Sequence, residues 1–119
     1  MDSPVERLRI KDWALEDRPR EKLLLKGVTS LSDAELLAIL VRSGTKSETA
    51  VQISQRILSS VSNNLSELGK LSVKELMDFK GIGEAKAVTI TAAMELSRRK
   101  SVSQPVHHYM FSIIYKDFY

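Results

Sequence analysis

The chain has 119 residues, of which 28% are charged and 43% hydrophobic, with a net charge of +3 and no cysteine. This length suffices for one small domain with a modest core, and the lack of cysteine excludes disulfides, thiolate catalysis and cysteine-based zinc sites. The longest apolar run, Leu36–Val41, is too short to span a bilayer, and no secretory signal precedes the first charged residues. We therefore expect a cytoplasmic protein without membrane contact.

Residues 1–18 are polar and nearly charge-balanced, and we expect an arm that packs Trp13 on the domain. Arg18-Pro19 then predicts the start of a short helix, because proline is favoured at the first helical position, and Gly27 is a plausible stop. We expect the helical domain itself to span residues 19–100.

Two later segments carry the same helix-start pattern, in which a serine precedes a glutamate by three positions. Ser32 with Glu35, and Ser72 with Glu75, are both typical of a capping box. Further helices are expected over about 49–61 (Ala50, Ile53, Ile57 and Leu58 inward), over 65–68, and from 84 or 85 to about 99 (Ala87, Ile90, Thr91, Met94 and Leu96 inward).

The two segments indicate an internal repeat. Ser32 and Ser72 lie 40 positions apart, while Ala50, Ile53 and Ile57 correspond to Ala87, Ile90 and Met94 at a spacing of 37. We predict an all-α fold, a small helical bundle of two helix-hairpin-helix units, the second regular and the first degenerate. The alternative is a coincidence between two ordinary helical hairpins.

The stretch Phe79–Ala87 carries the most informative motif, Gly81-Ile82-Gly83, between two helical patterns. Glycine allows a sharp turn, and Ile82 can point inward to fix it. The N–H groups of Gly83, Glu84 and Ala85 would then begin a helix unpaired, which is a favourable arrangement for phosphate. A dinucleotide fingerprint would need a third glycine in place of Lys86, so a helix-hairpin-helix motif, a sequence-independent binder of the nucleic-acid backbone, fits best.

The functional interpretation of this hairpin is contact with DNA phosphates and not with bases. The alternative is a purely structural turn, which Glu84 favours because its carboxylate would repel a phosphate. In the first hairpin, Thr45 could also touch phosphate, and Ser47 and Thr49 could cap the next helix. The predicted phosphate-binding residues are Lys80, Gly81, Ile82, Gly83, Ala85 and Lys86 in the second hairpin and Arg42, Gly44 and Lys46 in the first.

Catalytic chemistry is not indicated. Adjacent His107 and His108 cannot both face one metal from a regular helix or strand, and no carboxylate stands at ligand spacing to help them. No nucleophile, base and acid set stands out. We expect no catalytic residue, no metal and no cofactor.

The chain resembles the amino-terminal part of the RadC-like (UPF0758) family over about residues 8–100. The resemblance rests on Ile10–Trp13, Glu16–Leu23, Leu31–Leu40 and Gly81–Ala87. It implies a helical domain of helix-hairpin-helix character, followed in whole members by a JAB/MPN domain that resembles zinc-dependent metalloproteases. The His-x-His and downstream Asp signature of that domain is absent here, so the resemblance implies no hydrolase activity for this chain. The family resemblance also implies a link to DNA repair.

The resemblance also makes residues 101–119 a linker or a remnant of the entry to that second domain. Its aromatic residues, from Tyr109 to Phe118, could meet a protein partner or a second copy of the chain. Two hypotheses stand: a sequence-independent DNA-binding module, or a structural domain that positions a metalloprotease-like domain without touching DNA.

Overall fold

The computed structural model describes residues 18–103, and these are helical with short connections and no strand, which confirms the prediction of an all-α fold. The assignment of two helix pairs as helix-hairpin-helix motifs stays a prediction. The elements, in chain order, are α1 (Pro19–Lys26), the 3-10 turn η4 (Val28–Ser30), α2 (Asp33–Val41), α3 (Ala50–Ser60), α4 (Leu65–Leu68), α5 (Val73–Met77) and α6 (Glu84–Ser103).

Both predicted capping boxes are present. The Glu35 N–H donates to Ser32 Oγ at 3.1 Å while the Ser32 N–H donates to Glu35 Oε1 at 2.9 Å. Ser72 and Glu75 repeat this exchange at 3.0 and 2.9 Å. Each box satisfies two backbone groups that the first helical turn cannot pair internally.

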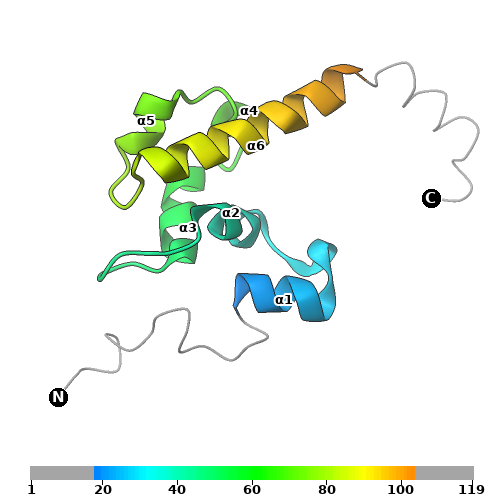
Figure 1. Ribbon diagram of the computed structural model, residues 1–119, viewed down its shortest axis with the longest axis vertical. Helices are drawn as coiled ribbons and strands as arrows, with labels where there is room; N and C mark the ends of the chain where they lie inside the picture. The colour runs from blue at the N-terminus through cyan, green and yellow to red at the C-terminus, as the bar shows by residue number, and fades with distance from the viewer. Residues whose placement is uncertain (1–17, 104–119) are drawn as a thin grey trace, which may run out of the picture.

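The core lies where two helix pairs meet. The first helix pair comprises α2, the loop 42–49 and α3, and the second comprises α5, the loop 78–83 and α6. α2 packs against both α3 and α6, and α6 lies across the bundle above them (Figure 1). The largest fully buried side chains include Ile53, Ile57, Leu76 and Ile90, so both pairs contribute to one core.

α1 lies on the opposite side of α2 from α6, at the edge of the bundle (Figure 1). Its predicted limits are confirmed, with Pro19 at the first helical position. Gly27 ends this helix with a φ of +90°, a backbone conformation that residues with a side chain rarely adopt.

The last helix differs from its prediction in two ways. It continues to Ser103, four residues past the expected end near Arg99, so the basic residues Arg98 and Arg99 lie within it and pair with Glu95. Leu96 was expected inward but is 69% exposed. It lies nine residues after the buried Ala87, and at about 100° per residue this places it on the opposite face of the helix.

Two hydroxyl residues occupy corresponding positions in α3 and α6, one after each inward isoleucine, Ile53 or Ile90. Ser54 is fully buried, and its hydroxyl donates to the Ala50 carbonyl at 2.8 Å. The hydroxyl oxygen of Thr91 is also buried but has no hydrogen-bond partner among the described residues. The two hydroxyl residues therefore occupy corresponding positions but differ in their hydrogen bonding.

The predictions for Trp13, His107, His108 and the segment Tyr109–Phe118 lie outside the described residues.

Candidate nucleic-acid interface

The start of α6 is built differently from the starts of α2, α3 and α5. The Ala87 N–H donates to the Gly83 carbonyl at 3.0 Å, which makes Gly83 the N-cap, a residue without a side chain to cap the helix. Within residues 18–103, no acceptor pairs with the N–H groups of Gly83, Glu84 or Ala85. The third helical position holds Lys86, where α2, α3 and α5 carry Glu35, Gln52 and Glu75.

The two glycines of the motif have separate roles. Gly81 has a φ of +95°, and a Cβ there would lie 2.8 Å from Ile53 Cδ1, so the turn and the packing both require glycine. A Cβ on Gly83 would meet nothing within 4 Å, and its φ is not positive. Ile82 between them is buried in the core, as predicted, and fixes the turn. The space that a side chain at position 83 would occupy is therefore open, and it lies at the start of α6 beside the unpaired N–H groups.

The first helix pair closes its loop with polar contacts. Thr49 caps α3, accepting from the Gln52 N–H at 3.1 Å, while Gln52 Oε1 accepts from the Thr49 N–H at 2.8 Å. The prediction that Thr49 caps is therefore confirmed. Ser47 does not cap the helix, because its hydroxyl lies beside Thr45 Oγ1, which accepts from the N–H groups of Ser47 and Glu48.

Arg42 and Gly44 shape the beginning of this loop. Arg42 ends α2 with a φ of +76°, an uncommon conformation for a residue with a side chain. A Cβ on Gly44 would overlap the Glu48 carbonyl, so the two limbs of the loop approach through this glycine. Arg42 and Lys46 are exposed, and within residues 18–103 neither forms an ion pair with a carboxylate.

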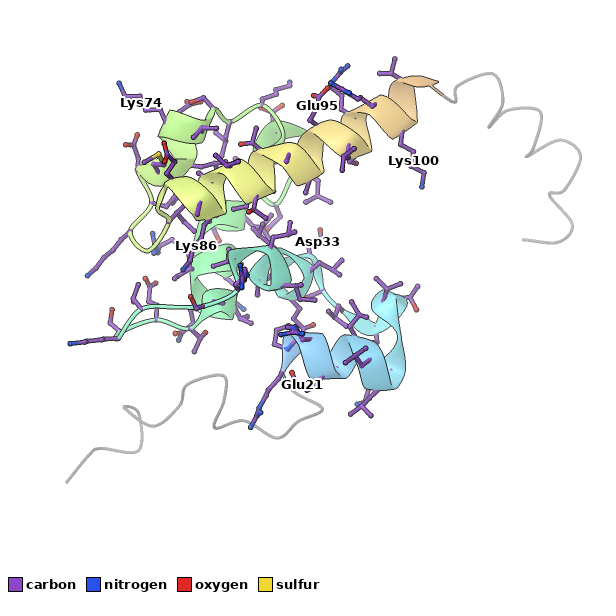
Figure 2. The ribbon with its side chains drawn as sticks, in the orientation of Figure 1. Glu21, Asp33, Lys74, Lys86, Glu95 and Lys100 are labelled. Atoms are coloured by element: carbon purple, nitrogen blue, oxygen red, sulfur yellow. The ribbon has the colours of Figure 1, made fainter. Side chains whose placement is uncertain are left out.

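Two cations fasten the two helix pairs together. Lys86 Nζ donates to the Ser43 carbonyl at 2.6 Å and more distantly, at 3.4 Å, to the Gly81 carbonyl. Figure 2 shows Lys86 at the start of α6 on the side that faces α2 and α3. On the other side, Arg56 donates to both Glu48 carboxylate oxygens and to the Lys80 carbonyl at 2.8 Å.

The ion pair of Arg56 has an electrostatic consequence for Glu48. The hydrogen bonds from the Arg56 guanidinium hold the pKa of the Glu48 carboxyl below its ordinary value of 4.5, with Coulombic attraction adding to them. Glu48 therefore stays ionised and paired at neutral pH. Because its charge is already matched by Arg56, it opposes an incoming anion less than an isolated carboxylate would.

A surface cleft of about 1050 Å³ joins the first loop to the start of α6. It is lined by the last turn of α2, the loop 42–49, the first turn of α3, the first two turns of α6 and the start of α1. The charged side chains that line it are Arg18, Arg20, Arg42, Lys46 and Lys86, together with Glu21 and Glu48.

The cleft brings together five of the nine predicted phosphate-binding residues: Arg42, Gly44, Lys46, Ala85 and Lys86. The other four, Lys80 to Gly83, form the turn beside it. Sequence reasoning missed the contribution of α1, whose Arg18 and Arg20 reach the cleft only through the tertiary fold. The one local sign was the presence of cations in a first helical turn, where acidic residues are favoured.

The described part of the chain shows no metal centre and no membrane span. Between residues 18 and 103, no three His, Cys, Asp or Glu side chains gather closely enough to hold a metal ion. No helix in the same range is long and apolar enough to cross a bilayer.

Comparison with known proteins gives a consistent family. A UPF0758 protein of Flavobacterium johnsoniae is 63% identical over 91 residues, covering 76% of this chain and 39% of that protein. UPF0758 proteins of Porphyromonas gingivalis and Bacillus licheniformis are 52% and 51% identical, each covering 77% of this chain and 41% of the relative. The chain thus spans about two-fifths of the length of these curated relatives, and no solved structure matches it. Residues 10–88 match the family described as UPF0758 N-terminal, and the chain belongs to this family.

Proposed function

We propose that this chain is a sequence-independent module that binds the DNA backbone. The observation that carries the proposal is the start of α6, where a glycine N-cap with open space before it precedes unpaired N–H groups and a lysine at the third position. Unpaired N–H groups and the helix dipole together favour a phosphate at such a place. The module itself is not an enzyme, and its resemblance to RadC-like proteins would connect it with DNA repair in the cytoplasm.

Lys86 can serve both the fold and the ligand. An ammonium group has three N–H donors, and two of these face the carbonyls of Ser43 and Gly81. One donor remains for a phosphate oxygen. The exposed cations Arg42 and Lys46 on the neighbouring loop would add attraction that reads no bases.

Glu84 limits the strength of this site but does not block it. Its side chain is exposed at the first position of α6, where an acid stabilises the helix dipole. The carboxylate would weaken phosphate binding, so one such hairpin supplies modest, salt-sensitive affinity. Binding to duplex DNA should therefore fall steeply as the salt concentration rises.

The test compares two substitutions at one open position. Gly83→Asn and Gly83→Asp both introduce a side chain that can cap α6, and nothing obstructs either. Only the aspartate adds a negative charge before the N–H groups. We expect Gly83→Asp to weaken binding to short duplex and branched DNA about tenfold at low salt, and Gly83→Asn to weaken it much less.

These variants separate binding from folding. Reversing Lys86 would break its bond to Ser43, whereas changes at Gly83 leave both fastening contacts intact. Lys74→Glu on α5 serves as a control for net charge, because Lys74 points outward from α5 (Figure 2). Failure of the unmodified chain to bind DNA at low salt, or equal binding by Gly83→Asp, would reject the proposal.

A second candidate is a docking domain for the rest of a longer protein. It is favoured by the exposed apolar side chains Val88, Leu96 and Val102 along the outer side of α6. Such a role suits a chain that spans two-fifths of its relatives, whose remaining part would resemble a JAB/MPN domain. Hydroxyl-radical labelling should then modify Leu96 in this chain but spare it when the chain is joined to the remaining part of a full-length relative. Equal labelling of both would exclude docking on this face.

A further inference from the structure

The cleft beside α6 is lined by more cations than carboxylates, and the fold does not require this excess of positive charge. Arg20, Arg42 and Lys46 are exposed and, within residues 18–103, make no ion pair with a carboxylate. Of the two acids that line the cleft, Glu48 is already paired with Arg56, which lies outside it. The cleft therefore presents a surplus of positive charge from α1, the first loop and α6.

Two of the cations that line the cleft, Arg20 and Lys86, lie where a positive charge weakens their own helices. Arg20 lies in the first turn of α1, and Lys86 lies in the first turn of α6. A positive side chain there opposes the helix dipole, whereas α2, α3 and α5 carry acids or an amide at their third positions. Helix stability therefore does not explain Arg20, whose exposed charge lines the cleft.

The residues of α2 that line the cleft are apolar. Ile39, in the last turns of α2, is only half-buried and lines the cleft without joining the buried core. A duplex keeps the faces of its bases stacked inside and presents phosphates on a broad convex surface. Grooves that bind single strands combine positive charge with side chains that contact the faces of the bases. An unpaired strand would offer its base faces to the apolar residues of α2 and its phosphates to the surrounding cations.

We propose that this cleft holds a short single-stranded nucleic-acid segment, which leaves a duplex bound at the start of α6. The inference rests on the proposed function and deepens it, because it names the substrate class as a duplex with a single-stranded extension. No aromatic side chain lines the cleft, so contacts with bases would be weak and tolerant of sequence. Arg20 comes from α1 and Lys46 from the loop 42–49, and both would hold the strand through its phosphates.

The experiment measures fluorescence anisotropy with a blunt duplex, the same duplex carrying a single-stranded tail of about ten nucleotides, and the tail alone. Thymidine and uridine tails are compared, because the cleft chemistry fits either backbone. We expect the tailed duplex to bind about fivefold more tightly than the blunt one. Arg20→Glu changes a cation that lines the cleft but lies outside the proposed duplex site, and it should remove most of this preference while leaving blunt-duplex binding within about twofold.

The variants are chosen so that unfolding cannot imitate the result. A glutamate in place of Arg20 favours the dipole of α1, and circular dichroism should show unchanged helix content. Lys74→Glu supplies the same change in net charge away from the cleft and should keep the preference for the tail.

The outcomes distinguish the inference from the proposed function. Equal affinity for blunt and tailed duplexes with either tail, while Gly83→Asp still weakens binding, would overturn the inference about the cleft and leave the duplex site standing. A tail preference that survives Arg20→Glu would also overturn it. If neither duplex binds, the proposed function fails first.

Discussion

The two helix pairs share one pattern of apolar residues but begin their second helices in opposite ways. α3 starts with a complete capping box, and its loop is tied together through Thr45 and Thr49. α6 starts at a glycine and carries Lys86 where α3 has Gln52. The two pairs thus bury similar residues at corresponding positions but differ at the polar starts of their second helices. The comparison shows that similar apolar packing is compatible with different chemistry at the helix ends.

The largest effect on stability should come from a substitution of Gly81, in the turn of the second helix pair. This glycine combines a positive φ with close packing against Ile53 in the core. Gly81→Ala forces a Cβ towards Ile53 and retains a φ of +95°, so we expect a loss of about 2 to 3 kcal/mol of unfolding free energy. Gly83→Asn should change it by less than about 1 kcal/mol. Urea unfolding of both variants tests the contrast, and equal losses would show that the two glycines have the same role.

A smaller loss should follow removal of the contact that fastens the two pairs through Arg56. Arg56→Met keeps the aliphatic length but removes the bonds to Glu48 and to the Lys80 carbonyl. Because the pair is partly exposed, we expect a loss of about 1 kcal/mol, measured by urea unfolding. Arg98→Met on the outer part of α6 is the matched control, since its ion pair with Glu95 joins no two elements. An equal effect of both changes would argue against a fastening role.

The same contact should appear in the dependence of stability on pH. The pKa of Glu48 in the folded chain is below its ordinary value of 4.5, so its contribution is fully present above that value. The contribution is lost as the pH falls below 4.5 and through the lowered pKa. Between about pH 6 and pH 3, unmodified protein should lose more stability than Arg56→Met. Parallel profiles of stability against pH for the two proteins would show that the Glu48–Arg56 pair does not contribute to this dependence.

The smallest effect should come from the buried hydroxyls at corresponding positions. Thr91→Val removes an unpaired buried oxygen and keeps the shape, so stability should be unchanged or rise by up to about 1 kcal/mol. Ser54→Ala removes a hydroxyl that is bonded to the Ala50 carbonyl and should lower stability slightly. Thermal unfolding of both variants decides the matter, and a clear loss in Thr91→Val would mean that its hydroxyl has an unrecognised partner.

The sequence predicted those features that depend on neighbouring residues. The capping boxes at Ser32 and Ser72 and the stop at Gly27 follow from local hydrogen bonds and backbone conformation, and all were found. The exposure of Leu96 was missed because the stripe was extended without following the helical rotation of about 100° per residue.

The candidate site was less accessible to such reasoning. Lys86 was predicted to meet phosphate, but its bond to Ser43 joins residues 43 positions apart and has no local signal. Similarly, the cations at the start of α1 were a local sign of an unusual helix end, but they did not indicate that this end would line the same cleft as the start of α6. Contacts of this kind depend on how the helices pack, which periodicity alone does not determine.

The length of α6 has a mechanical consequence. Met94 is its last side chain packed against the core, and the helix runs on to Ser103 beyond the bundle (Figure 1). At about 1.5 Å per residue, this adds a rod of roughly 14 Å. The ion pairs of Glu95 with Arg98 and Arg99 brace this rod along its surface. In a longer protein, such a rod would transmit the orientation of the bundle to whatever follows it, as a lever arm and not as a hinge.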